Sequence, residues 1–277
     1  MTAEDPDRAL SSPIESVLEE MQARIDRLPD RLAHQRVFLS TYRRMTRSVG
    51  TAVADGLFED AEWVQRWDVS FVDFYLRALD GETAGGDGVP EPWRRAFRAP
   101  SDLPPLRHVL LGINAHINHD LPQALLAIIS DEDFDDATVM ALRRRDHQRV
   151  DTVLSSQVAS ESNELAGPDG LSVLDRVLRP LNRKGSQRFL REARAKVWHN
   201  SQQLHLARMD GPAALAGRLA ELETLAADKV TDLLRPGQVL LRLTFTGFGV
   251  RLSTPTDPSL RGYDRRELRR GGSVNDG

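Results

Sequence analysis

Cysteine is absent from the 277 residues of the chain. Disulfide bonds, thiolate zinc sites and a cysteine nucleophile are therefore excluded. Any metal ion would have to be bound by His, Asp, Glu or Asn side chains. Without disulfides the fold must be stabilised by a hydrophobic core, for which the chain is long enough.

Lysine is scarce, since only Lys184, Lys196 and Lys229 occur and arginine carries nearly all of the positive charge. Arginine binds phosphate and carboxylate groups through paired hydrogen bonds, but a coding bias explains the same composition. The formal net charge of −4 gives no basic footprint for nucleic acid and no polybasic patch for a membrane surface. We therefore expect neither nucleic acid nor a membrane as a partner.

Long apolar runs and a secretion signal are also missing. No stretch approaches the roughly 18 apolar residues of a membrane span, and the N-terminal residues lack basic and apolar signal regions. We expect a cytoplasmic protein without membrane insertion. The chain has no P-loop, dinucleotide fingerprint or G-x-S-x-G motif, so the usual support for NTPase, Rossmann oxidoreductase and serine hydrolase functions is lacking.

Apolar residues recur at helical spacing along most of the chain. The residues from Ser12 to Glu15 form a capping box that opens the first helix, and Asp60 is placed to cap a helix that ends at Asp80 and Gly81. We predict helices at about 12–28, 31–55, 60–80, 91–97, 107–130, 133–160, 186–209 and 212–234.

These helices predict an all-α fold with a single domain of about eight helices over residues 12–236. Residues 237–253 are predicted to add a small β-hairpin, because apolar and polar residues alternate around Leu241, Leu243 and Phe245. Residues 1–11 and 254–277 are expected to be disordered.

Residues 107–123, RHVLLGINAHINHDLPQ, carry polar side chains where a plain amphipathic helix would not place them. On a helical wheel, the apolar residues of this stretch form one arc that must face the core. Asn114 and Asp120 fall inside the arc and His116 lies at its edge. The other two histidines, His108 and His119, lie on the opposite side.

His116 and Asp120 stand four residues apart, so their side chains lie about one turn apart on one helix face. A carboxylate in the core needs a dedicated partner, and this pair suits metal ligation. A second interpretation stays open because Pro122 cannot donate a hydrogen bond to the carbonyl of Asn118. In that case the helix breaks, Asp120 caps a new helix that begins at Leu121, and His116 has no catalytic role.

The run LLGINAHINHDLP resembles the hallmark of a bacterial family of unknown function, whose members carry a pattern close to L-L-G-x-N-A-H-I-N-x-D-L. The resemblance extends through YRRMT, Phe58-x-Asp60-x-x-Trp63 and Phe71-x-x-x-Tyr75, over roughly residues 35–150. It implies an all-α fold but no reaction. His119 stands at a variable position of the pattern, which makes it a weaker catalytic candidate. The resemblance draws attention to Asn114, His116, Asn118 and Asp120.

The H-x-x-x-D spacing before a proline is similar, more loosely, to helical zinc-dependent phospholipases C and single-strand nucleases. Those enzymes need further ligands, including an N-terminal residue and a second helix that bears histidine. The later histidines here are His147, His199 and His205, so a three-metal site is not expected. The remaining expectation is one divalent ion, Zn²⁺ or Mg²⁺, held by His116, Asp120 and a residue from another helix.

Four residues outside this stretch are candidates for lining a substrate pocket: Trp63, Asp73, Tyr75 and His199. Trp63 and Tyr75 belong to the aromatic residues of the helix at 60–80, and Asp73 interrupts them. Two alternatives stay open, namely that Asp73 pairs with an arginine and that His199 lies half-exposed at a helix boundary.

Three functional hypotheses follow. In the first, Asn114, His116, Asn118 and Asp120 form a buried pocket that binds one divalent ion and hydrolyses an ester or phosphoester of a small molecule. In the second, the protein is a metal-free cyclase or lyase of specialised metabolism, and His116 and Asp120 transfer protons. In the third, the protein is not an enzyme and the polar cluster fixes helix packing.

Overall fold

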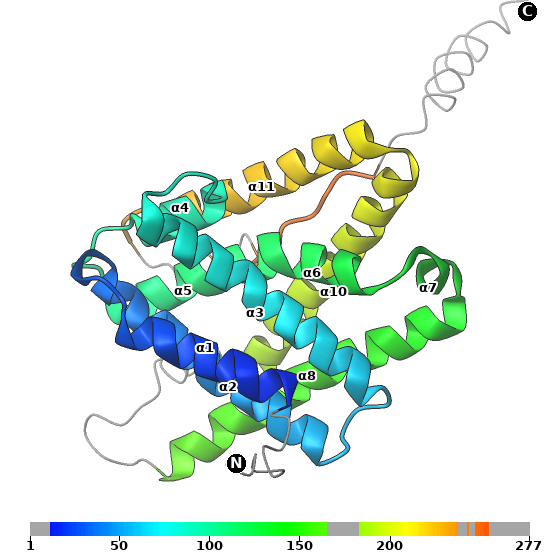
Figure 1. Cartoon of the computed structure of the whole chain (residues 1–277), viewed down its shortest axis with the longest axis horizontal. Helices are drawn as coiled ribbons and strands as arrows, with labels where there is room; N and C mark the ends of the chain where they lie inside the picture. Colours follow the sequence, from blue (N-terminus) through cyan, green and yellow to red (C-terminus); the bar gives the residue numbers. More distant parts are fainter. Residues whose placement is uncertain (1–11, 165–182, 238–242, 244–246, 255–277) are drawn as a thin grey trace, which may run out of the picture.

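The computed structural model describes residues 12–164, 183–237, 243 and 247–254, and within these it contains helices and no strand (Figure 1). The predicted all-α fold is thereby confirmed. The hairpin predicted at 237–253 lies partly outside the described residues, but Leu243 is helical and residues 247–254 form neither helix nor strand. The tails predicted at 1–11 and 254–277 lie outside the described residues, apart from Thr254.

The first half of the chain forms four α-helices. The predicted capping box is present, because the Glu15 N–H donates to Ser12 Oγ and the Ser12 N–H donates to Glu15. Asp60 caps the third helix as predicted, but this helix continues past Gly81 to Ala84, and Gly85 is its C-cap. Gly85 has a φ of 136°, which ends a helix, whereas Gly81 keeps a helical φ. The elements are α1 (Pro13–Asp26), a 3-10 turn (Asp30–Gln35), α2 (Arg36–Ala54), α3 (Ala61–Ala84) and α4 (Glu91–Phe97).

The second half begins with one nearly continuous helical rod, made of two α-helices joined by a π-helical turn. The rod lies between the group α1, α2 and α3 and the pair α10 and α11 (Figure 1). The elements are α5 (Pro105–Ala115), the π-helical turn (His116–Asp120), α6 (Leu121–Ile128), α7 (Asp131–Asp135), α8 (Ala137–Glu164), α10 (Arg183–Met209) and α11 (Pro212–Leu234).

The rod is packed by several helices, because α2, α3, α4, α10 and α11 all contact it. His108 and His119, which the helical wheel placed away from the core, are therefore buried, with exposed fractions of 2% and 6%. The wheel misplaced these two histidines because it assumes that the face opposite the apolar arc meets solvent, whereas the partly exposed positions of the rod include Ile113, Ile117 and Gln123.

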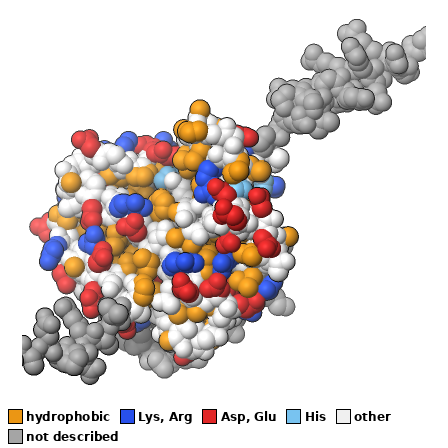
Figure 2. All heavy atoms as spheres, turned by 45° about the vertical axis from the view of Figure 1, so that its right-hand side comes forward, with side chains coloured by type: hydrophobic (Ala, Val, Ile, Leu, Met, Phe, Trp, Pro, Cys, Tyr) orange, Lys and Arg blue, Asp and Glu red, His pale blue; other side chains and the backbone are white. Residues whose placement is uncertain are grey.

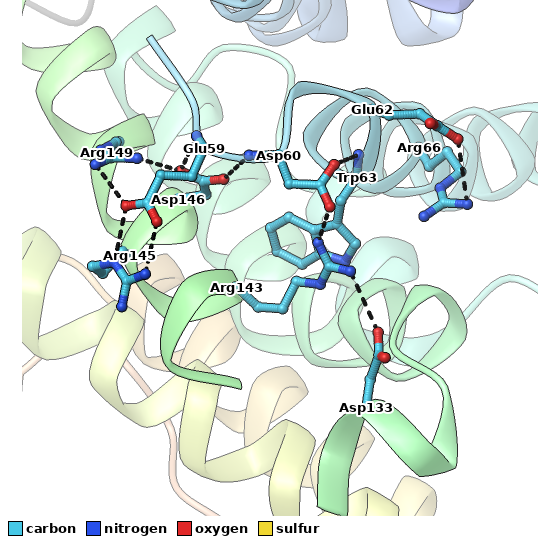
Figure 3. Close-up of polar contacts among 10 residues, drawn as sticks. All are labelled: Glu59, Asp60, Glu62, Trp63, Arg66, Asp133, Arg143, Arg145, Asp146 and Arg149. Atoms are coloured by element: carbon cyan, nitrogen blue, oxygen red, sulfur yellow. Dashed lines mark hydrogen bonds and ion pairs between the residues drawn. The ribbon is translucent and has the colours of Figure 1, made fainter. Parts of the chain in front are cut away.

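A network of charged side chains joins the start of α3 to α8 (Figure 3). The carboxylate of Asp146, which is fully buried, accepts hydrogen bonds from the backbone N–H groups of Glu59 and Asp60. Arg143 pairs with Asp60 and lies over the ring of Trp63. The Phe58-x-Asp60-x-x-Trp63 pattern thus has a structural role, since it positions the aromatic helix α3 against α8.

The surface carries both signs of charge. On the face drawn in Figure 2, arginine and lysine side chains are interspersed with aspartate and glutamate. None of the described helices is long and apolar enough to cross a membrane.

Gly112 allows close packing of α2 on α5. A Cβ atom at Gly112 would lie 2.5 Å from the ring of the buried Phe38. Gly112→Ala should therefore lower the free energy of unfolding by about 1–3 kcal/mol through overpacking. Gly217 is a matched control on the exposed side of α11, because a Cβ atom there would meet no neighbouring group within 4 Å. Gly217→Ala should raise stability by roughly 0.5–1 kcal/mol. Urea unfolding curves measure both changes, and a neutral Gly112→Ala would contradict the packing.

Candidate functional site

The π-helical turn at His116–Asp120 has a cause in the sequence. Pro122 has no N–H group, and in a regular α-helix its ring would collide with the carbonyl of Asn118. The turn is widened instead, and the N–H of Leu121 donates to the carbonyl of His116. The helix therefore continues through the proline into α6, and such wide turns often occur at functional sites.

The carboxylate of Asp120 lies in the core, with 1% of its side chain exposed, and it accepts hydrogen bonds from three side chains. Its Oδ2 atom accepts from Trp93 Nε1 at 2.7 Å and from His116 Nδ1 at 2.8 Å. Its Oδ1 atom accepts from His119 Nδ1 at 2.6 Å. The interpretation of Asp120 as a helix cap is therefore wrong, because its side chain makes no capping hydrogen bond.

His119 belongs to this network although its position in the sequence pattern argued against it. Because Nδ1 donates to Asp120, Nε2 is left as an acceptor, and the side-chain amide of Gln123 lies 3.2 Å from it. The same amide donates to the carbonyl of His119 at 2.8 Å. Both ring nitrogens of His119 are thus occupied, and the residue acts as a support for Asp120.

His116 has one occupied and one open ring nitrogen. Nδ1 donates to Asp120, whereas Nε2 is buried and has no hydrogen-bond partner among the residues that the structure describes. The ring of Phe71 stacks on the imidazole at a centroid distance of 3.5 Å, and the ring of Tyr42 meets it edge-on at 4.6 Å. Tyr75 and Trp93 also lie beside the imidazole, at centroid distances of 6.1 and 5.8 Å.

Burial and hydrogen bonding set the protonation of the pair. Burial lowers the pKa of His116 below 6.5, although Asp120 opposes this effect. Burial works to raise the pKa of Asp120, but the hydrogen bonds from His116 and His119 outweigh it and hold the pKa below 3.8. Near neutral pH the pair is a carboxylate and a neutral imidazole with a lone pair on Nε2.

Two tyrosine hydroxyls in the same aromatic group also lack partners. The side chains of Tyr42 and Tyr75 are buried, and within the described part of the chain neither hydroxyl has a hydrogen-bond partner of good geometry, although the Thr46 hydroxyl lies beside that of Tyr42. Burial raises the pKa of both phenols. At Tyr42 the charges of Asp68 and Asp120 add to this rise, and the Thr46 hydroxyl opposes it. Both hydroxyls therefore stay protonated and can donate hydrogen bonds. Tyr75 was proposed from sequence as a pocket residue, and it lies at this site.

Asn114 and Asn118 form hydrogen bonds with the backbone of a later segment of the chain. Their amide groups both donate to the carbonyl of Phe248, at 3.3 and 3.1 Å. Asn118 also accepts a hydrogen bond from the backbone of Val250 at 3.0 Å. These two residues hold residues 247–253, an extended segment that we call the strap. The catalytic role expected of them from sequence stays a prediction.

The other predicted pocket residues lie apart from His116. Asp73 is exposed and pairs with Arg77 at 3.1 Å, which matches the alternative interpretation from sequence. His199 is half-buried, and its Nε2 lies 3.1 Å from the carbonyl of Leu252 in the strap. Trp63 is fully buried and stacks on Trp67 in the N-terminal part of α3.

The donor groups do not fit the metal ion expected from sequence. Both carboxylate oxygens of Asp120 and the Nδ1 atom of His116 are already engaged in hydrogen bonds with each other and with Trp93 and His119. Within the described part of the chain, no group of three or more His, Cys, Asp or Glu side chains could hold a metal ion. His116 and Asp120 are therefore not supported as metal ligands.

Sequence reasoning missed Trp93, Asp68 and His147. Trp93 donates to Asp120 from α4, and its only signal was a tryptophan in a short helix after a glycine-rich loop. Asp68 and His147 are buried, and the described residues supply no hydrogen-bond partner for the Asp68 Oδ2 and His147 Nε2 atoms. Burial raises the pKa of Asp68 and lowers that of His147. Buried polar atoms without a hydrogen-bond partner are uncommon in proteins. The interior around Asp68 and His147 therefore holds polar atoms whose hydrogen bonds the surrounding side chains do not provide.

Asp68 makes stability depend on pH. Burial raises its pKa from 3.8 to about 7, partly offset by Arg194. Between these values the unfolded chain releases a proton that the folded chain retains, so the stability contributed by Asp68 falls as pH rises through this window. Relative to wild type, Asp68→Asn should gain up to about 4 kcal/mol in unfolding free energy between pH 4 and pH 8.

Urea unfolding at several pH values tests this prediction. Asp73→Asn is the matched control on the same helix, because Asp73 is exposed and paired with Arg77. It should follow the wild-type pH profile within about 0.5 kcal/mol. Parallel profiles for Asp68→Asn and wild type would show that Asp68 does not carry the raised pKa.

Comparison with known proteins places the chain in a family. No curated protein and no solved structure matches it. The family match covers residues 14–236, a wider range than the resemblance seen in the sequence. The match confirms the predicted resemblance to an uncharacterised family, while the hallmark pattern and the looser similarity to zinc-dependent phospholipases and nucleases stay predictions. The chain belongs to the Family of unknown function (DUF5995).

Proposed function

We propose that the protein is an enzyme that transfers protons on a small, largely apolar molecule, with His116 as the general base. The observation that carries the proposal is the open Nε2 atom of His116, which is buried and unpartnered while Nδ1 is fixed by Asp120. A carboxylate that holds one imidazole nitrogen orients the ring, selects its tautomer and stabilises the imidazolium that forms after proton uptake.

The tyrosines supply the complementary group. A neutral phenol donates hydrogen bonds without being ionised, which suits the stabilisation of negative charge on a substrate oxygen. The reaction class that uses a neutral imidazole base beside two phenols is proton abstraction from a carbon next to a carbonyl. In a β,γ-unsaturated ketone, His116 Nε2 takes the proton from the α-carbon, the C–H electron pair forms a C=C bond, and the C=O π pair moves to the oxygen, to which Tyr42 and Tyr75 donate. The product is a dienolate. Return of the proton from His116 to its γ-carbon restores the C=O bond, leaves the C=C bond conjugated with it and completes an isomerisation.

The surroundings favour an apolar substrate. The rings of Phe38, Tyr42, Phe71, Tyr75 and Trp93 all lie within about 6.5 Å of the imidazole, measured between ring centroids. His116 is 4% exposed, so a substrate reaches it only when the aromatic side chains of α2 and α3 move apart. Closure of these rings over the substrate would then exclude water from the reaction.

This proposal follows the metal-free hypothesis from sequence in preference to the single-metal hydrolase. Both use His116 and Asp120, but the hydrolase requires Asp120 to give up hydrogen bonds from buried N–H groups in order to ligate an ion. Leaving those donors unpaired in the core would cost about 1–3 kcal/mol each.

Deuterium exchange tests the proposed proton transfer before the substrate is known. The protein is incubated in D₂O with a panel of aryl ketones and β,γ-unsaturated ketones, and C–H to C–D exchange is followed by NMR. Wild type should accelerate exchange, His116→Gln should lose it by roughly 10²-fold or more, and Tyr42→Phe and Tyr75→Phe by roughly 10-fold or more. His205→Gln is the control, since His205 packs on Phe134 away from the site.

The outcome against the proposal is equally defined. If wild type exchanges none of the panel above the His116→Gln background, and His116→Gln and Asp120→Asn both lower stability by several kcal/mol, the cluster is a structural network.

The pH dependence of the same exchange follows from the pKa of His116. Because burial lowers this pKa below 6.5, the imidazole stays a base in weakly acidic solution. The rate should be constant near neutral pH and fall as pH drops through a value below 6.5, where His116 becomes protonated. If the exchange rate instead falls with a midpoint above the ordinary pKa range of histidine, the base is another group.

A further inference from the structure

The strap is held by side chains of helices that are distant from it in sequence. It runs between α10 and α11 (Figure 1), and it contacts the π-helical turn through Asn118. We call the contacting side chains the strap site; they are Asn114, Asn118, Lys196, His199, Asn200, Arg218 and Glu221.

Two asparagines bind the backbone of the strap at a regular spacing. Asn118 donates to the carbonyl of Phe248 and accepts from the N–H of Val250, at 3.1 and 3.0 Å. Asn200 donates to the carbonyl of Val250 and accepts from the N–H of Leu252, at 3.1 and 2.9 Å. The spacing of two residues is the period of an extended chain, so each amide replaces a peptide group of a neighbouring strand.

Further side chains complete the backbone contacts. Lys196 donates to the carbonyl of Gly249 at 3.0 Å, and Arg218 donates to the carbonyl of Ser253. Glu221 accepts from the N–H of Ser253 at 3.2 Å. These hydrogen bonds are made to backbone atoms, so they do not depend on the identity of the strap side chains.

Alternate side chains of the strap provide the apolar contacts. Phe248 and Leu252 are buried, with exposed fractions of 2% and 1%, whereas Arg251 is exposed. Leu252 and Val250 pack with Leu204 and Leu222 in an apolar cluster beside the main core. Gly249 is needed for close approach, because a Cβ there would lie 2.8 Å from Lys196 and 3.2 Å from Ala193.

The strap lies outside the part of the chain that matches the family, and the strap site lies inside it. The match ends at residue 236, before the strap begins, and it includes every side chain of the strap site. Backbone hydrogen bonds combined with pockets for alternate side chains are the chemistry of extended-peptide recognition.

We propose that the strap site is a binding site for an extended peptide with the pattern aromatic-Gly-apolar-x-apolar, and that residues 247–253 occupy it as an intramolecular ligand. A peptide of this pattern on another molecule binds there when the strap is displaced. The site is distinct from His116 Nε2, and its ligand would be recognised whether or not His116 transfers protons.

A peptide-binding experiment tests the proposal on the full chain. Phe248→Ser combined with Leu252→Ser removes both buried anchors and vacates the site. A labelled peptide of residues 246–254, TGFGVRLST, is then titrated and followed by fluorescence anisotropy. We expect saturable binding to the double variant and at least roughly tenfold weaker binding to wild type, whose own strap competes at high effective concentration.

Matched controls separate specific recognition from adhesion. The same peptide with Gly249→Val should lose binding, because the added side chain clashes with Lys196 and Ala193. A peptide with N-methylated Val250 and Leu252 should also lose binding, because these residues can then no longer donate to Asn118 and Asn200. Adding Asn200→Leu to the double variant should weaken binding roughly tenfold or more, whereas adding Asp73→Asn should not.

If the double variant does not fold alone, the peptide is added during refolding and helical circular dichroism is the readout. Recovery of the helical signal with the peptide, and not with its Gly249→Val form, supports the proposal. A folded double variant that does not bind the peptide at about 1 mM overturns it, and so does an unfolded one that the peptide does not restore.

Discussion

The carboxylate of Asp120 determines the arrangement of the groups around it. A buried charge without partners costs several kcal/mol, so the fold must bring N–H donors to it. Trp93 reaches it from α4, and His116 and His119 reach it from within the π-helical turn. Once these donors are in place, the orientation of the His116 imidazole is decided, and its other nitrogen faces the aromatic side chains of α2 and α3.

The π-helical turn connects this charge to the rest of the structure. Widening the turn lets the chain pass Pro122 without ending the helix, and it places two histidines against one carboxylate although they are three residues apart. The same turn presents Asn118 to the strap. One local irregularity therefore serves both the proposed proton-transfer site and the proposed peptide site, on different sides of the rod.

The sequence predicted part of the site because spacing within one helix is local information. The pairing of His116 with Asp120 and the capping by Asp60 depend on residues three or four apart, and both are present. Partners from other helices could not be predicted in this way. Trp93, Asp68 and Tyr42 reach the interior only through packing between helices, and no periodicity in a single sequence reports that packing.

The sequence by itself determined the helical fold, the start of most helices and the need for a partner at Asp120, because these follow from periodicity, capping and the cost of a buried charge. Only the tertiary structure decided that the N–H groups of Trp93, His116 and His119 are partners of Asp120, that His108 and His119 are buried, and that Asn114 and Asn118 hold the strap. The physical reason is that burial and hydrogen-bond partners are properties of packed neighbours, and those neighbours lie far away along the chain.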